Sequence, residues 1–117
     1  MPNVKMGADI SSFKSGIAAA KSEVKTLDQQ MKMLDATLKA EGKSEQTLAM
    51  QTQTLNQRMA AQKNMANQAE AALKAMTKAG IDPTSEAYQR MAREMLAAQT
   101  GMMETQAALN EIGRAHV

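Results

Sequence analysis

The chain has 117 residues and a formal net charge of +2, from 14 Lys and Arg against 12 Asp and Glu, and it has no cysteine. This near balance of charge does not favour nucleic acid or an anionic membrane as a partner, and the lack of cysteine excludes disulfides and thiolate zinc sites. Aromatic residues make up only 2% of the chain, whereas methionine reaches 12 residues. The composition predicts an all-α chain of helical rods with narrow apolar seams.

Residues 1–9 are predicted to form an extended lead or a short strand, because residues 4–8 alternate weakly in hydropathy. Asp9 is expected to cap the helix that follows, since a carboxylate there can accept a hydrogen bond from a free backbone amide. The most apolar run, residues 16–20, is far shorter than the ~20 residues that a membrane span needs, so no membrane role is predicted for this segment.

The first predicted helix, residues 10–41, carries an unbroken heptad stripe, with apolar residues spaced alternately by three and four positions. Two arrangements are open: an amphipathic helix packed on its own neighbour, or a coiled coil between chains. Asp28 and Asp35 lie one heptad apart on what is predicted to be a solvated flank. The stripe consists of Ile10, Phe13, Ile17, Ala20, Val24, Leu27, Met31, Leu34 and Leu38.

The second predicted helix, residues 44–79, continues this register with a poorer stripe. Gly42 suits a helix C-cap and Ser44 a new N-cap. Either the glycine bends one long rod or the two helices fold back as a hairpin, and the glycine and serine together favour the hairpin. The second stripe consists of Leu48, Thr52, Leu55, Met59, Gln62, Ala66, Ala69, Leu73 and Met76.

A stronger break precedes the third predicted helix, residues 83–110. Gly80 stops the second helix, Ile81 is placed for a Schellman contact, Asp82 is a candidate N-cap, and Pro83 suits the first helical position. The register shifts by one position here, which predicts a change of chain direction. The third stripe consists of Tyr88, Met91, Met95, Ala98, Met102, Thr105 and Leu109.

The large side chains of the three stripes form the candidate site, which we name the helix-association seam. No catalytic, cofactor-binding or metal-binding residues are predicted. The Gly42-Lys43-Ser44 stretch resembles the end of a phosphate-binding loop, but Thr37 stands where that motif needs a glycine. The seam consists of Ile10, Phe13, Ile17, Val24, Leu27, Met31, Leu34, Leu38, Leu48, Leu55, Met59, Leu73, Met76, Tyr88, Met91, Met95, Met102 and Leu109.

The order of these segments resembles the N-terminal segment of phage tail tape measure proteins, the minor tail proteins also found in bacterial prophages. The resemblance runs through VKMGADISSFKSGIAAAKSEVKTLDQQMKML, LKAEGKSE, LNQRMAAQKNMANQAEAALKAM and AGIDPTSEAYQRMAREMLAAQTGMMETQAALN, and so spans residues 4–110. Such proteins lie inside the assembling tail tube and set its length by their own length. The order of these segments along the chain carries the resemblance.

The resemblance implies a non-enzymatic structural protein of the virion tail, which is present in the bacterial host cytoplasm during assembly. Its implied partners are further copies of itself, the tail tube and tail assembly chaperone proteins. Family members run to many hundreds of residues, so a chain of this length is expected to be a truncated fragment. The alternative is a free-standing bacterial coiled-coil adaptor that acts through oligomerisation.

The last seven residues, EIGRAHV at 111–117, contain the single histidine of the sequence, His116. Reverse-translated as GAG ATC GGA AGA GCA CAC GTC, they match the start of a common short-read sequencing adapter from the second base onward. These residues are therefore expected to be a non-native tail, in which His116 carries no function.

Overall fold

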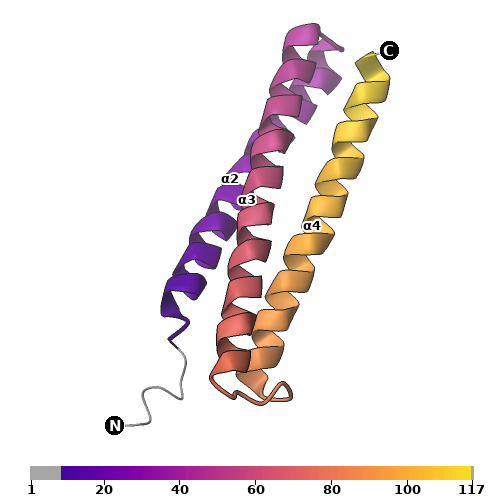
Figure 1. Ribbon diagram of the computed structural model, residues 1–117. Helices are drawn as coiled ribbons and strands as arrows, with labels where there is room; N and C mark the ends of the chain where they lie inside the picture. The colour runs from indigo at the N-terminus through magenta and orange to yellow at the C-terminus, as the bar shows by residue number, and fades with distance from the viewer. Residues whose placement is uncertain (1–8, 117) are drawn as a thin grey trace.

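The computed structural model describes residues 9–116, which form three long helices joined by two short turns (Figure 1). Helix α2 spans Ser11–Glu41, α3 spans Glu45–Lys78 and α4 spans Glu86–His116. They run antiparallel to their neighbours in an elongated body of 63 × 20 × 17 Å. The predicted all-α class is confirmed; the predicted N-terminal lead lies almost wholly outside the described residues.

Helix α3 is the central element of the fold. It packs against α2 on one face and against α4 on another, whereas α2 and α4 make no close backbone approach to each other within the described residues. The first two helices thus fold back on each other as a hairpin and do not continue as one bent rod (Figure 1). The apolar stripe of α2 is covered by the chain's own second helix.

The turn between α2 and α3 follows the predicted caps. Gly42 has φ 83° and ψ 176°, a region of backbone conformation open essentially to glycine alone. Its amide donates to the Leu38 carbonyl at 2.8 Å and closes the last turn of α2. Ser44 then begins α3, because its hydroxyl accepts a hydrogen bond from the Thr47 amide at 3.1 Å.

The turn after α3 is a Schellman motif, as the sequence predicts. The Gly80 amide donates to the Thr77 carbonyl at 3.0 Å, and the Ile81 amide donates to the Met76 carbonyl at 2.9 Å. Gly80 has φ 80°, the left-handed conformation that this motif requires at its glycine. Ile81 packs against the core cluster that contains Met76, which supplies the hydrophobic contact of the motif.

Two of the predicted N-caps, Asp82 and Asp9, do not occupy the capping position of the helix that follows them. Helix α4 begins at Glu86, not at Pro83, because Asp82 is used in a preceding turn: its carboxylate accepts hydrogen bonds from the amide and the hydroxyl of Thr84, both at 2.9 Å. Ser85 takes the capping position, where its hydroxyl accepts from the Tyr88 amide at 3.3 Å. The hydrogen bonds from Thr84, with the backbone amide first, hold the pKa of Asp82 below its ordinary value.

At the start of α2, the capping position belongs to Ile10 and not to Asp9. Asp9 instead accepts from the Ser11 amide at 3.1 Å and also from the Ser11 hydroxyl. These two hydrogen bonds, of which the hydroxyl one is the stronger influence, lower the pKa of Asp9. At the other end of the chain, α4 continues as far as His116 and so includes residues 111–116 of the expected non-native tail.

Candidate functional site

The helix-association seam lies along the interfaces between the three helices. Six of its residues are buried, and every one of the others is half-buried. The buried six are Ile17, Leu27, Leu48, Leu55, Met76 and Met91. The seam residues therefore pack helices of the same chain against each other, and little of their surface is left for a partner molecule.

Small residues allow the helices to approach closely. Ala69 and Ala72 of α3 are fully buried in a cluster that also contains Ile17 of α2 and Met91 of α4. A second cluster joins the three helices through buried alanines and one methionine. It consists of Ala20, Met65, Ala66 and Ala98.

Helix α3 has a second buried face that the single predicted stripe does not include. A helix in the middle of three must bury two faces, and a pattern of alternating three- and four-residue spacings describes only one. The additional buried residues are mostly small or polar and therefore give no clear hydrophobic signal. They are Gln51, Thr54, Ala61, Met65 and Ala72.

A polar layer crosses the bundle and connects all three helices. Arg58 of α3 reaches in two directions: its Nε lies 2.7 Å from Oδ1 of Asp28 on α2, and its Nη1 donates to the hydroxyl of Thr105 on α4 at 2.6 Å. The Arg58 side chain is only 18% exposed and that of Thr105 is fully buried. Arg58 thus lies between the two outer helices and binds to both.

Gln62 completes this polar layer. We orient the Gln62 side-chain amide so that both its nitrogen and its oxygen have hydrogen-bond partners. Its Nε2 then donates to the Thr105 hydroxyl at 2.7 Å and to the Gly101 carbonyl at 3.0 Å, and its Oε1 accepts from Arg58 at 3.2 Å. The Thr105 hydroxyl donates to the same Gly101 carbonyl at 2.9 Å. Since no buried polar atom of this layer lacks a hydrogen-bond partner, the layer stabilises one relative position of the three helices.

The two aspartates predicted on a solvated flank both bond to α3. Asp28 remains half-exposed while it pairs with Arg58, and Asp35 accepts from Nε2 of Gln51 at 2.8 Å. The Oε1 atom of Gln51 is buried and has no hydrogen-bond partner among the described residues. Both carboxylates therefore link α2 to α3.

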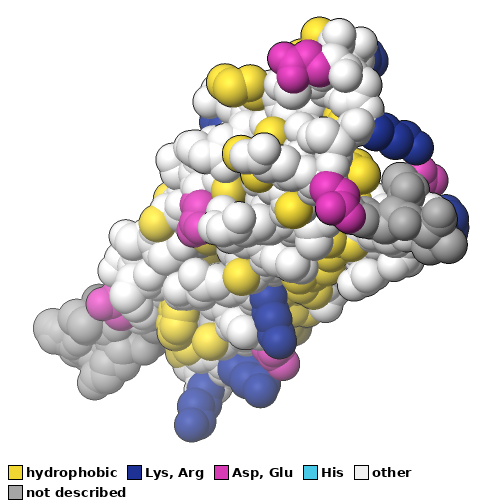
Figure 2. Space-filling model, turned by 90° about the horizontal axis from the view of Figure 1, so that it is seen from above, with side chains coloured by type: hydrophobic (Ala, Val, Ile, Leu, Met, Phe, Trp, Pro, Cys, Tyr) yellow, Lys and Arg dark blue, Asp and Glu magenta, His cyan; other side chains and the backbone are white. Residues whose placement is uncertain are grey.

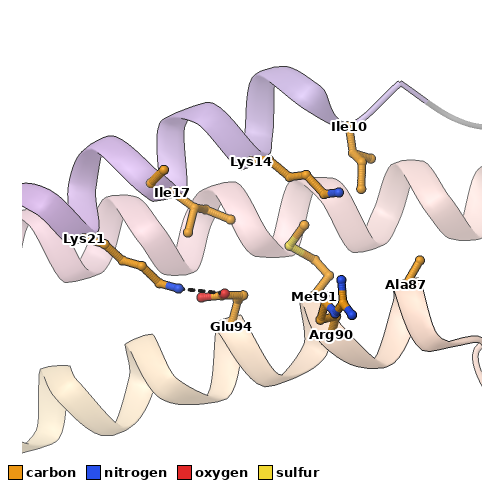
Figure 3. Close-up of a pocket in the computed structure, with 9 residues that line it drawn as sticks. Ile10, Lys14, Ile17, Lys21, Ala87, Arg90, Met91 and Glu94 are labelled. Carbon is orange, nitrogen blue, oxygen red and sulfur yellow. Dashed lines mark hydrogen bonds and ion pairs between the residues drawn. The ribbon is translucent and has the colours of Figure 1, made fainter.

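An open groove lies between α2 and α4, with α3 as its floor. Near the start of both helices the groove contains a hollow of about 280 Å³. Across it, Nζ of Lys21 on α2 lies 2.7 Å from Oε2 of Glu94 on α4 (Figure 3). Lys14 and Arg90 also border this hollow, and Met91 forms part of its apolar wall. Further along, a shallower hollow of about 590 Å³ lies next to the polar layer, beside Gly101.

The described residues contain no cluster of His, Cys, Asp and Glu that could hold a metal ion. Within the same part of the chain, no helix is long and apolar enough to cross a membrane.

Comparison of the chain with known protein families, with characterised proteins and with solved structures finds no match. The fold and surfaces described above therefore define an elongated antiparallel three-helix bundle with an open side groove.

Proposed function

We propose that the chain is a structural, non-enzymatic segment of a phage tail tape measure protein. The observation that carries the proposal is the order of segments over residues 4–110, which resembles the N-terminal segment of that family. Gly42 and Gly80, which lie within two of the resembling segments, form the turns between the three packed helices. The proposed setting is the virion tail, and the host cytoplasm during assembly.

The folded bundle bears on how such a segment would act. The 106 residues from 11 to 116, as one straight helix, would measure roughly 160 Å at the usual rise per residue. The bundle is 63 Å long because the helices fold back on one another. In this proposal the segment serves as a compact assembly module, and its proposed partners are the tail tube, the tail assembly chaperones and other copies of itself.

The gene's natural location tests this proposal. We expect the genes for a tail tube protein and a tail assembly chaperone directly upstream, and a reading frame that continues past Asn110 in codons unlike those of the adapter. The tagged chain, co-expressed with those upstream products, should co-purify with at least one of them. A tail tube protein from an unrelated phage is the control.

A free-standing coiled-coil adaptor is the second candidate. One observation favours it: α3 is covered on two faces by its own chain, so the bundle has a core of its own. A natural genomic copy that ends in a stop codon directly after Val117, away from tail genes, would support this candidate and contradict the tape measure proposal.

A further inference from the structure

Helix α4 has an apolar strip on the side that faces away from α3. Ala98 is buried against α3, and Leu96, two residues earlier, lies about 200° round the helix. Leu96 is 62% exposed, and Met103, one heptad later, is 72% exposed. Single exposed apolar residues are ordinary, but two large ones at heptad spacing form a short seam of their own. Figure 2 shows hydrophobic side chains reaching the surface among charged ones.

Two charged residues border this strip, and neither has an ion-pair partner among the described residues. The other charges of α4 are paired as Glu86–Arg90, Lys21–Glu94 and Glu111–Arg114, with the exception of Arg93 and Glu104. Arg93 and Glu104 both line the shallow hollow, and a separation of eleven residues brings them within about 20° of each other round the helix, so they lie on the same flank of α4. We name Arg93, Leu96, Thr100, Met103 and Glu104 the outer strip.

The outer strip is complementary to itself when a second copy is turned end for end. Arg93 and Glu104 are equally distant from a point between residues 98 and 99, and Leu96 and Met103 are equally distant from a point between 99 and 100. An antiparallel pair of α4 helices would therefore bring each Arg93 close to Glu104 of the other copy. A parallel pair would instead bring like charges together, which is unfavourable.

We propose that the outer strip of α4 is a docking surface for a second copy of this chain, which binds antiparallel about a two-fold axis near residue 99. On one flank each Arg93 pairs with Glu104 of the other copy, and on the other flank each Leu96 packs against the opposite Met103. All five residues of the outer strip are exposed, and four of them lie along the open groove, so the second copy can approach from solvent. This pairing of two chains does not require a role in phage tails.

Charge reversal tests the docking surface directly. Sedimentation velocity on the wild-type chain, up to about 1 mM, should show a monomer–dimer equilibrium. Arg93→Glu and Glu104→Arg should each weaken the dimer by about tenfold, because each places like charges together twice. The double variant Arg93→Glu/Glu104→Arg should recover dimerisation, since it exchanges the two members of each pair. A wild-type chain that stays monomeric, or a double variant no better than the single ones, would overturn the proposal.

The apolar part of the surface has its own test and a matched control. Leu96→Glu should abolish the dimer, whereas Met33→Glu, at a residue of α2 that is 70% exposed, should leave it intact. Both variants should keep the wild-type melting temperature when dilute, because both side chains are mostly exposed. Equal loss of the dimer in the two variants would overturn the assignment to α4.

Orientation is measured separately with spin labels, since the chain has no cysteine of its own. In Gln89→Cys the labels of an antiparallel pair should lie about 30 Å apart, because Gln89 is some ten residues from the axis in each copy. A parallel pair would bring the same labels to about the distance between two packed helices, roughly 10 Å. A short distance at Gln89 would therefore contradict the antiparallel arrangement.

Discussion

Thr105 is a single buried hydroxyl on which the polar layer depends. It bonds with Arg58 and Gln62 of α3 and with the Gly101 carbonyl of its own helix. A buried donor that loses its partner costs more than the hydrogen bond itself contributed, because the donor can no longer reach water. The contribution of Thr105 is therefore expected to exceed that of a threonine on the surface.

Thr105→Val should lower the free energy of unfolding by about 1–3 kcal/mol, since valine keeps the shape of threonine and leaves Arg58 and Gln62 without their common partner. The matched control is Thr26→Val: the Thr26 hydroxyl also bonds the carbonyl four residues earlier, at 3.2 Å, but it is exposed. Urea unfolding of both variants gives the comparison. Equal changes in the two would contradict the role given to the polar layer.

For individual residues, the sequence predicted which side chains face a neighbouring helix but not which of them form hydrogen bonds or ion pairs with it. The three- and four-residue spacing placed Gln62 and Thr105 in their stripes. The link between Asp28 and Arg58 was not foreseen, because it depends on which face of α3 meets α2. Heptad spacing within one helix carries no information about the level at which another helix lies beside it.

Between pairs of helices, glycine has two different roles in this bundle. Gly42 and Gly80 have positive φ and end helices, whereas Gly101 lies within α4 and Gly16 within α2, where each is approached by a glutamine side chain of α3. A Cβ on Gly101 would lie 2.5 Å from the terminal amide of the Gln62 side chain. The two mid-helix glycines thus differ in whether their glutamine neighbour can move away.

Gly101→Ala should destabilise the bundle by about 1–3 kcal/mol, because Gln62 is buried and bonded and cannot yield without loss. Gly16→Ala should be neutral or stabilising by up to about 1 kcal/mol, since Gln68 is half-buried and can turn toward solvent while alanine improves helix propensity. Urea midpoints for both variants decide between these outcomes. Similar effects at the two sites would show that the polar layer does not restrain Gln62.

The turn before α4 gives a prediction about pH. Because the pKa of Asp82 is lowered in the folded chain, its ionised form stabilises the fold above the ordinary value of 3.8, and this contribution is lost as pH falls through the lowered pKa. The melting temperature of Asp82→Asn should lie below that of the wild type by a constant amount between about pH 5 and 7. The difference should shrink below about pH 3.8. A difference that persists unchanged in strong acid would argue against the carboxylate as its cause.

The turns were the most predictable elements, yet only in part. The Gly80-Ile81 end of α3 followed from residue types alone, because a Schellman motif needs a glycine and then an apolar residue. The start of α4 did not follow, since Asp82 and Ser85 are both good caps and both lie before Glu86. Which of two adjacent caps begins the helix depends on the path of the turn, and that path is fixed by the packing of α4 against α3.

For the molecule as a whole, helix formation should not require association between chains. The heptad stripe of α2 was compatible with packing inside the chain or between chains, and the structure covers it with α3. We therefore expect the circular dichroism at 222 nm, per residue, to stay the same from about 1 to 100 µM, because packing within one chain does not depend on concentration. Docking through the outer strip would not alter this signal, since α4 is already helical.

A marked loss of helical signal on dilution would contradict packing within one chain and would favour the intermolecular coiled coil.

The fold class, the number of helices over the described residues and the position of both turns followed from the hydrophobic periodicity and from the turn-forming residues of the sequence. The central place of α3 did not follow, because its second buried face is made of residues such as Gln51 and Ala61 that also occur on surfaces.

The odd number of antiparallel helices over residues 9–116 has a mechanical consequence. Helix α2 begins at one pole of the 63 Å body and α4 ends at the other (Figure 1). A force that pulls on these two ends acts along the helix axes. It therefore shears the helix interfaces, including the polar layer, and does not peel one helix away from the next. A bundle of four such helices would bring its ends together and open one contact at a time. This bundle would instead resist tension as a unit until its interfaces slip, with a force set by its unfolding rate.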